Sequence, residues 1–101
     1  MATDLTGLDY RNGGAMYTLS GVSTTWTQIL IPKWAKLVTI QPEAQAIYFG
    51  YDGTDGAAVG THRFPQAVSS IIQYNPQQTA YSRSIFVASQ TGTATIYLIF
   101  E

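Results

Sequence analysis

The sequence predicts an all-β domain: an antiparallel β-sandwich of jelly-roll or immunoglobulin-like type, with about seven strands. Short segments rich in β-branched and aromatic residues recur roughly every ten residues, with turn residues between them. Helical spacing is nearly absent, because only VSSIIQY (68–74) approaches it and that stretch is too short for a stable helix. With 101 residues, the chain has the usual size of one domain and can bury a core.

Seven segments have strand character. They are AMYTLS (15–20), TTWTQILI (24–31), KLVTIQ (36–41), QAIYFGY (45–51), AVSSIIQY (67–74), SIFVAS (84–89) and ATIYLIFE (94–101). In the last segment Ile96, Leu98 and Phe100 share one face, while Tyr97 and Ile99 share the other. Because both faces are apolar, this strand is expected to be central or covered on both sides. Trp26, Tyr48, Phe49, Phe86 and Tyr97 lie inside these segments and are expected in the core.

Turn chemistry marks the connections between the segments. Pro32 ends the second segment, and QTGT (90–93) predicts a short hairpin loop between the last two. Residues 1–14 are polar, are interrupted by glycine and end in Asn12-Gly13-Gly14, so they predict a flexible N-terminal arm. Residues 15–101 are then the single sandwich domain.

The charge balance narrows the classes of molecule that the protein is expected to bind. A net charge of −1 gives no basic footprint for nucleic acid or an anionic membrane, so we expect neither partner. The chain has no cysteine and therefore no disulfide. No apolar run approaches the ~18 residues that span a bilayer. The N-terminal residues lack the basic and apolar regions of a signal peptide, so we expect synthesis in the cytoplasm.

Charged residues are unusually scarce. They make up 11% of the chain, against about 25% in an average soluble domain. Ser, Thr, Asn and Gln together supply 30 residues instead. Burying a neutral hydrogen-bonding group costs far less than burying a charge. The composition therefore predicts a protein that works packed against neighbours, as a homo-oligomer within an assembly.

The loop YDGTDGAAVGTHRF (51–64) contains the candidates for a cation site, Asp52 and Asp55. The EF-hand pattern fails, since Arg63 stands where that pattern requires the closing glutamate. Asp-Gly pairs also form turns without any ion, because glycine accepts a positive φ. We therefore expect no metal and no cofactor. His62 is the single histidine, and with no recognisable nucleophile motif near it we expect no enzymatic activity.

Aromatic and basic residues recur together in the predicted loops. Trp34, between two lysines, can stack on a sugar, dock into a neighbouring subunit or fold back over its own sandwich. Tyr and Arg are enriched at interface hot spots, so the candidate contact residues are Tyr10, Arg11, Trp34, His62, Arg63, Phe64, Tyr81 and Arg83. The connection from Asp52 to Phe64 is long for a hairpin, and long ordered loops often carry function. We expect its Gly/Ala stretch to let a neighbour approach closely.

Two stretches carry a resemblance to a known group of proteins. TWTQILIPKWAKLVTIQPEAQAIYFGYDGTDG (25–56) and SIFVASQTGTATIYLIFE (84–101) resemble small β-sandwich virion proteins of tailed bacteriophages, especially the decoration (cement) proteins. The pattern consists of the strand–Pro–turn–strand unit at 29–40, the aromatic strand entering Asp-Gly at 47–56 and the closing hairpin at 84–100. The resemblance implies a protein that binds and stabilises a capsid without catalysis.

The sequence thus predicts a capsid decoration protein on the virion surface. Its partners would be the major capsid protein and copies of itself, with a trimer one arrangement. The alternatives are a small tail or fibre component, or a carbohydrate- or receptor-binding sandwich that uses Trp34 and loop tyrosines. A calcium-dependent adhesion module would depend on Asp52 and Asp55.

Overall fold

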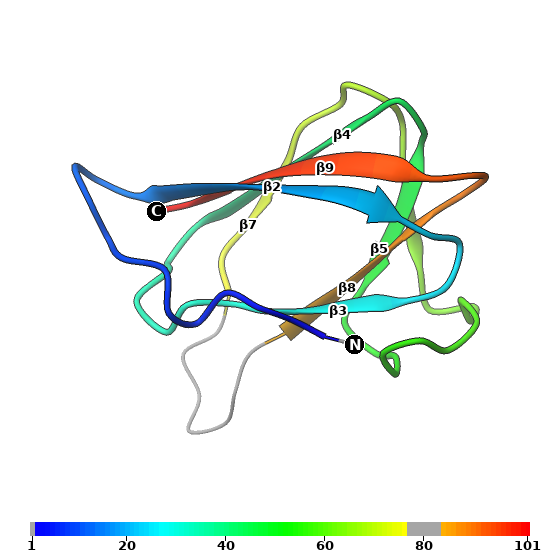
Figure 1. The fold of residues 1–101 in the computed structure, drawn as a ribbon, viewed down its shortest axis with the longest axis horizontal. Helices are drawn as coiled ribbons and strands as arrows, with labels where there is room; N and C mark the ends of the chain where they lie inside the picture. The colour runs from blue at the N-terminus through cyan, green and yellow to red at the C-terminus, as the bar shows by residue number, and fades with distance from the viewer. Residues whose placement is uncertain (1, 77–83) are drawn as a thin grey trace.

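The computed structural model describes residues 2–76 and 84–101, and in these residues the chain forms nine strands and no α-helix (Figure 1). No helix in this part of the chain has the length and apolar character needed to cross a bilayer. The strands are β1 (Thr3–Asp4), β2 (Ala15–Val22), β3 (Thr27–Leu30), β4 (Val38–Glu43), β5 (Ile47–Gly50), β6 (Phe64–Gln66), β7 (Ile72–Tyr74), β8 (Ser84–Ser89) and β9 (Ala94–Phe100).

The strands form two layers. One sheet has the order β1-β3-β8-β5-β6 and the other β2-β9-β4-β7. From β2 onward, every connection except the β5–β6 hairpin carries the chain from one sheet to the other. All pairs are antiparallel apart from β1 with β3. This strand order is that of a double-sheet jelly roll. The predicted all-β sandwich is confirmed, with two more strands than expected.

The core lies between the layers and follows from strand alternation. Side chains alternate between the two faces of a strand, so Ile85 and Val87 of β8 and Ile96 and Leu98 of β9 all point inward and are buried. Each such side chain contributes about 1.5–3 kcal/mol relative to an exposed one. Further buried residues of this core are Leu5, Val22, Ile29, Ile31, Ala35, Val38, Ile40, Ile47, Phe49, Ala94 and Phe100.

Strand β9 is central, as predicted, because it lies between β2 and β4. Its second apolar face is not covered by the described part of the chain. Tyr97 is 37% exposed and Ile99 36% exposed. The expectation that Tyr97 belongs to the core is therefore wrong. Its alternation was read correctly, but the second layer lies on the other side of the sheet.

Two strand predictions differ from the structure. The segment 67–74 is a strand only at β7, because Ser69 has a φ of 66° in the turn before it. The sequence does not predict strand β6, because Pro65 lowers the strand propensity of Phe64–Gln66. Proline, which has no N–H, is tolerated there because β6 is an edge strand and a position on its free side needs no donor to a neighbouring strand.

The predicted closing hairpin is wrong. Strands β8 and β9 belong to different sheets, so QTGT carries the chain across the sandwich. The turn chemistry was read correctly, since Gly92 has a φ of 63°. A turn reverses the direction of the chain, but the burial of apolar faces decides which sheet the next strand joins. Separate sheets bury Ile85 and Val87 of β8 and Ile96 of β9 in one core.

The N-terminal segment differs from the expected flexible arm. Strand β1 pairs in parallel with β3, and the N–H of Leu5 donates to the carbonyl of Leu30 at 3.0 Å. Leu5 is 4% exposed and belongs to the core, and Leu8 packs against it. Figure 1 shows this segment running beside β3. Leu5 and Leu8 thus anchor this mostly polar segment to the core of the sandwich.

Leu5→Ala tests the docking of this segment. We expect the substitution to lower the free energy of unfolding by about 2–3 kcal/mol, because it leaves a cavity in the core. Gly7→Ala is the matched control, since an added Cβ at Gly7 meets no atom within 4 Å. Urea denaturation of both variants measures the difference. Equal unfolding free energies of the two variants would instead support a flexible N-terminal arm.

Candidate functional site

The long connection 51–63 folds onto its own sheet. The N–H of Gly56 donates to the carbonyl of Trp26 at 2.7 Å, and the N–H of Trp26 donates to the carbonyl of Ala57 at 2.8 Å. The carboxylate of Asp55 accepts a hydrogen bond from the N–H of Gln28 at 2.9 Å. These bonds tie the loop to the start of β3.

Under this loop lies a second apolar cluster, on the outer face of the five-stranded sheet. Trp26, Phe86 and Ala88 are buried there, with Tyr48 and Val59 packed against them. The rings of Trp26 and Phe86 meet edge to face at 6.1 Å. A Cβ added at Gly53 would lie 2.9 Å from the Trp26 ring. The close approach predicted for this loop is therefore made to the chain's own sheet.

Both candidate cation ligands have protein partners. The hydrogen bond from the Gln28 N–H lowers the pKa of Asp55 below its ordinary value. Asp52 lies 3.3 Å from Nδ1 of His62, and both side chains are largely exposed. Among the described residues, no three His, Cys, Asp or Glu side chains gather around one point.

A hollow of about 380 Å³ opens where β5 ends and β6 begins. We call it the aromatic hollow, and it is lined by Phe49, Gly50, Tyr51, Asp52, His62, Arg63 and Phe64. Phe49 is almost buried, and its ring lies 5.3 Å from Phe64 and 6.4 Å from Tyr51. Tyr51 and Phe64 are 62% and 56% exposed. The hollow thus presents aromatic rings to solvent.

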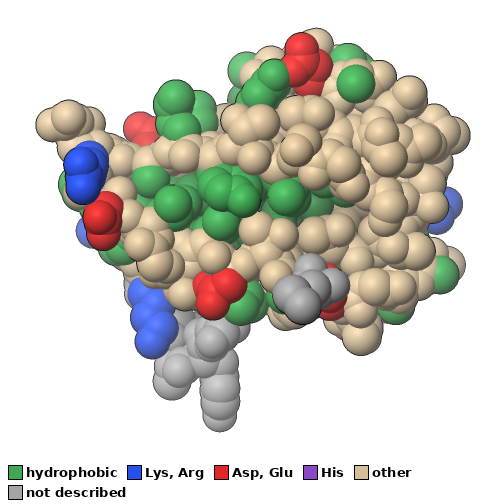
Figure 2. All heavy atoms as spheres, viewed as in Figure 1, with side chains coloured by type: hydrophobic (Ala, Val, Ile, Leu, Met, Phe, Trp, Pro, Cys, Tyr) green, Lys and Arg blue, Asp and Glu red, His purple; other side chains and the backbone are tan. Residues whose placement is uncertain are grey.

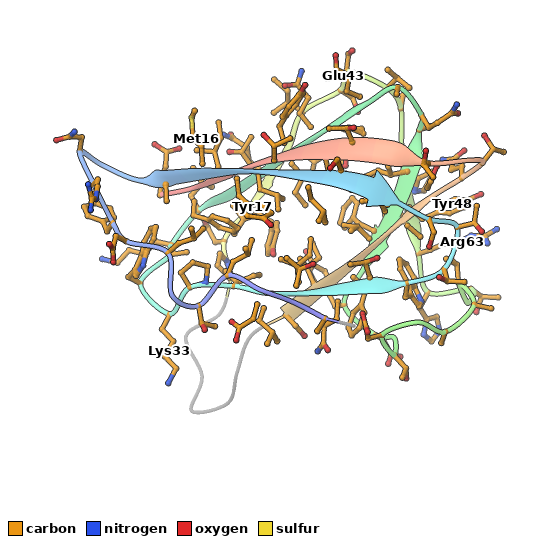
Figure 3. The ribbon with its side chains drawn as sticks, in the orientation of Figure 1. Met16, Tyr17, Lys33, Glu43, Tyr48 and Arg63 are labelled. Carbon is orange, nitrogen blue, oxygen red and sulfur yellow. The ribbon has the colours of Figure 1, made fainter. Side chains whose placement is uncertain are left out.

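Polar groups surround these rings. His62 and Asp52 face each other at 3.3 Å. The guanidinium of Arg63 lies over the ring of Tyr48, 4.3 Å from its centroid, and Figure 3 shows the two side chains side by side. Aromatic rings beside an imidazole, a carboxylate and a guanidinium suit a ligand with an apolar face and polar edges, such as a sugar ring. The sequence singled out His62, Arg63 and Phe64 but missed Tyr51, which follows the aromatic strand directly.

Three other candidate contact residues, Tyr10, Arg11 and Trp34, belong to or pack against the N-terminal segment and do not line the aromatic hollow. Trp34 folds back over its own sandwich, as one of the three alternatives had it: its Nε1 donates to the carbonyl of Leu8 at 3.0 Å. The ring of Tyr10 packs edge-on against it at 5.1 Å and is 58% exposed. Arg11 lies 3.6 Å from Asp9 at the surface. Tyr81 and Arg83 lie outside the described residues.

A second exposed surface is the outer face of the four-stranded sheet, which we call the open sheet face. Its strand residues are Met16, Thr18, Ser20, Thr39, Gln41, Glu43, Gln73, Thr95, Tyr97 and Ile99. Met16 is 74% exposed, stands opposite Ile99 in the ladder and points outward in Figure 3. The apolar second face of β9 was the sequence signal for this surface.

Glu43 is the one charged side chain among those strand residues. Its carboxylate accepts a hydrogen bond from the hydroxyl of Tyr97. That bond stabilises the neutral phenol and raises the pKa of Tyr97 above its ordinary value. The hydroxyl thus supplies one hydrogen-bond donor to the carboxylate on this face.

Comparisons with protein-family models, with curated proteins and with solved structures found no match.

Gly53→Ala tests the docking of the loop. We expect a loss of roughly 1–3 kcal/mol in unfolding free energy, because the new Cβ crowds the Trp26 ring. Gly60→Ala is the control, since a Cβ there meets nothing within 4 Å. Denaturation followed by tryptophan fluorescence measures both. If the loop did not pack on the sheet, the two variants would have equal unfolding free energies.

Asp55 gives a pH prediction. Because folding lowers its pKa, its contribution to stability is complete above the ordinary aspartate value and disappears as the pH falls through the lowered one. Asp55→Asn keeps an acceptor for the Gln28 N–H but cannot titrate. We expect a shallower loss of melting temperature between about pH 5 and pH 2 in this variant. An unchanged acid profile would contradict the assignment.

Proposed function

We propose that this chain is a virion structural protein of a tailed bacteriophage, a decoration protein that bridges neighbouring major capsid subunits by noncovalent contacts. The observation that carries the proposal is the open sheet face. It combines exposed apolar side chains with hydroxyls and amides, and it contains one carboxylate that already has a hydrogen-bond donor.

Such a face favours contact with protein over contact with solvent. Burying Met16, Tyr97 and Ile99 removes apolar area from water, at about 25 cal/mol per Å². The surrounding threonines and glutamines exchange water for partner hydrogen bonds at a small desolvation cost. The strands of the face are held by the jelly roll, so little conformational entropy is lost on binding.

The bacteriophage assignment is supported by the resemblance of residues 25–56 and 84–101 to phage decoration proteins. A bound chain stabilises the shell by mass action, because it binds assembled subunits and not dissociated ones. The low content of charged residues suits a protein that remains in such a lattice.

Met16→Glu in the virion tests this proposal. Purified wild-type particles should contain the chain at a copy number that matches the capsid lattice. A carboxylate at the exposed position 16 would be buried unpaired in the contact, so we expect at least about tenfold lower occupancy and a lower temperature of capsid rupture. Thr61→Glu, at an exposed site of the loop 51–63, is the charge-matched control. A handful of copies per particle, or full occupancy of the Met16→Glu chain, would contradict the proposal.

The aromatic hollow favours a second candidate function, a tail or fibre module that binds carbohydrate. Tyr51 and Phe64 offer stacking surfaces, and Asp52, His62 and Arg63 offer hydrogen bonds to hydroxyls. Phe64→Ala should abolish binding to a glycan array, whereas Tyr10→Ala, an exposed aromatic outside the hollow, should retain it. Absence of any signal from the wild-type chain would remove this candidate.

A further inference from the structure

We propose that strand β2 pairs with β2 of a second copy of this chain, antiparallel and about a two-fold axis, which joins two four-stranded sheets into one of eight strands. The inference goes beyond the proposed function, because binding to a capsid through the open sheet face requires no contact between copies. It is drawn from the strand edges of the two sheets.

Strand β2 is the longest strand and lies at the edge of its sheet. It has eight residues, and within the described chain it is hydrogen-bonded to β9 alone. In Figure 1 it forms the edge of the upper layer that faces the viewer. An edge strand leaves a row of backbone N–H and C=O groups available to another strand.

The other three edges are short or interrupted by proline. Strand β1 has two residues, β6 has three and contains Pro65, and β7 has three and is followed by Pro76. Short edges, proline, charge and β-bulges are the usual devices against edge-to-edge pairing. Strand β2 has neither proline nor charge, and no charged residue occurs from Asn12 to Pro32. Its ladder with β9 is irregular between Leu19 and Val22, which leaves the regular part from Ala15 to Leu19 as the edge available for pairing. This contrast within one molecule marks β2 as the edge that is paired.

The occupant that fits this edge is an identical strand. A two-fold contact sets the same patch against itself, so it needs no complementary charges. A charged peptide would place ions beside an edge that offers no partner for them. In Figure 2 a band of hydrophobic side chains runs along the seam between the two layers on this side, and few charged side chains flank it. A second uncharged, half-apolar strand covers such a seam.

The proposed register places Thr18 on the two-fold axis, which pairs residues 15–21 of the two copies. The irregularity of β2 between Leu19 and Val22 then lies at the end of the pairing, away from the axis. Met16 then stands opposite Ser20 on the outer face. Tyr17, which points between the layers in Figure 3, stands opposite Leu19 beside the seam. Both Tyr17 and Leu19 are half-buried in the single chain and pack against its core.

Cysteine crosslinking tests the pairing and its register on the purified chain. The native chain has no cysteine, so Thr18→Cys introduces a single thiol. Opposed residues of antiparallel strands have Cα atoms about 4.5–5.5 Å apart, within the range of a disulfide. We expect Thr18→Cys to form a covalent dimer under mild oxidation at least tenfold faster than Ser20→Cys. Ser20 is on the same exposed face but two residues from the axis. Equal rates for the two variants would overturn the register and the two-fold pairing.

Charge exchange tests the same contact without oxidation. On the axis, Thr18 faces its own copy, so Thr18→Lys alone and Thr18→Glu alone should each be monomeric. An equal mixture of the two should recover the dimer that the wild-type chain forms in light scattering. Because Thr18 is exposed, both variants should remain folded and lose only the part of the wild-type melting temperature that dimerisation contributes.

A wild-type monomer, a wild-type trimer or a mixture that stays monomeric would each overturn the pairing. This failure is distinguishable from failure of the proposed function. A monomeric chain that still decorates capsids removes the strand pairing alone. A dimer that is absent from virions removes the decoration role alone.

Discussion

Burial of two inner sheet faces against each other is the constraint on which the rest of this structure depends. Nearly every connection from β2 onward crosses between the layers, so neither sheet can form without the other. The core residues come from strands distant in sequence, such as Ile29 with Ile85 and Val38 with Phe100, which are ladder partners. The chain has no disulfide, so this packing and hydrogen bonds such as that from Nε2 of Gln66 on β6 to the carbonyl of Ile40 on β4 hold the layers together.

Once the inner faces are buried, the two outer faces differ. The five-stranded sheet has its outer cluster of Trp26, Phe86 and Ala88 covered by the chain's own loop 51–63. The four-stranded sheet leaves Met16 and Ile99 exposed. The loop 51–63 thus acts partly as internal cover, and the exposed apolar side chains include those of the open sheet face and of the aromatic hollow.

Strand alternation explains what could be predicted from the sequence. Segments 84–89 and 94–101 could be predicted because β-branched and aromatic residues are concentrated in both, with clear alternation in the second. The sheet to which each strand belongs could not be predicted from the sequence, since it depends on contacts between distant residues. For the same reason the sequence predicts a hairpin at 90–93, where the chain crosses between the sheets. His62, Arg63 and Phe64 were singled out by residue type. The open sheet face was missed because exposed and buried apolar faces of one strand look alike in sequence.

The scarcity of charge links the open sheet face to strand β2. An isolated chain with an exposed apolar face and an unprotected edge is prone to uncontrolled association. A two-fold contact is self-limiting, because it occupies the β2 edge of both copies and leaves none for a third. Antiparallel pairing places the two-fold axis perpendicular to the sheet, so the open sheet faces of both copies lie on the same side. The proposed edge contact uses the backbone of β2, whereas the proposed capsid contact uses the outer side chains of the same sheet, so the pairing would double the area of that face.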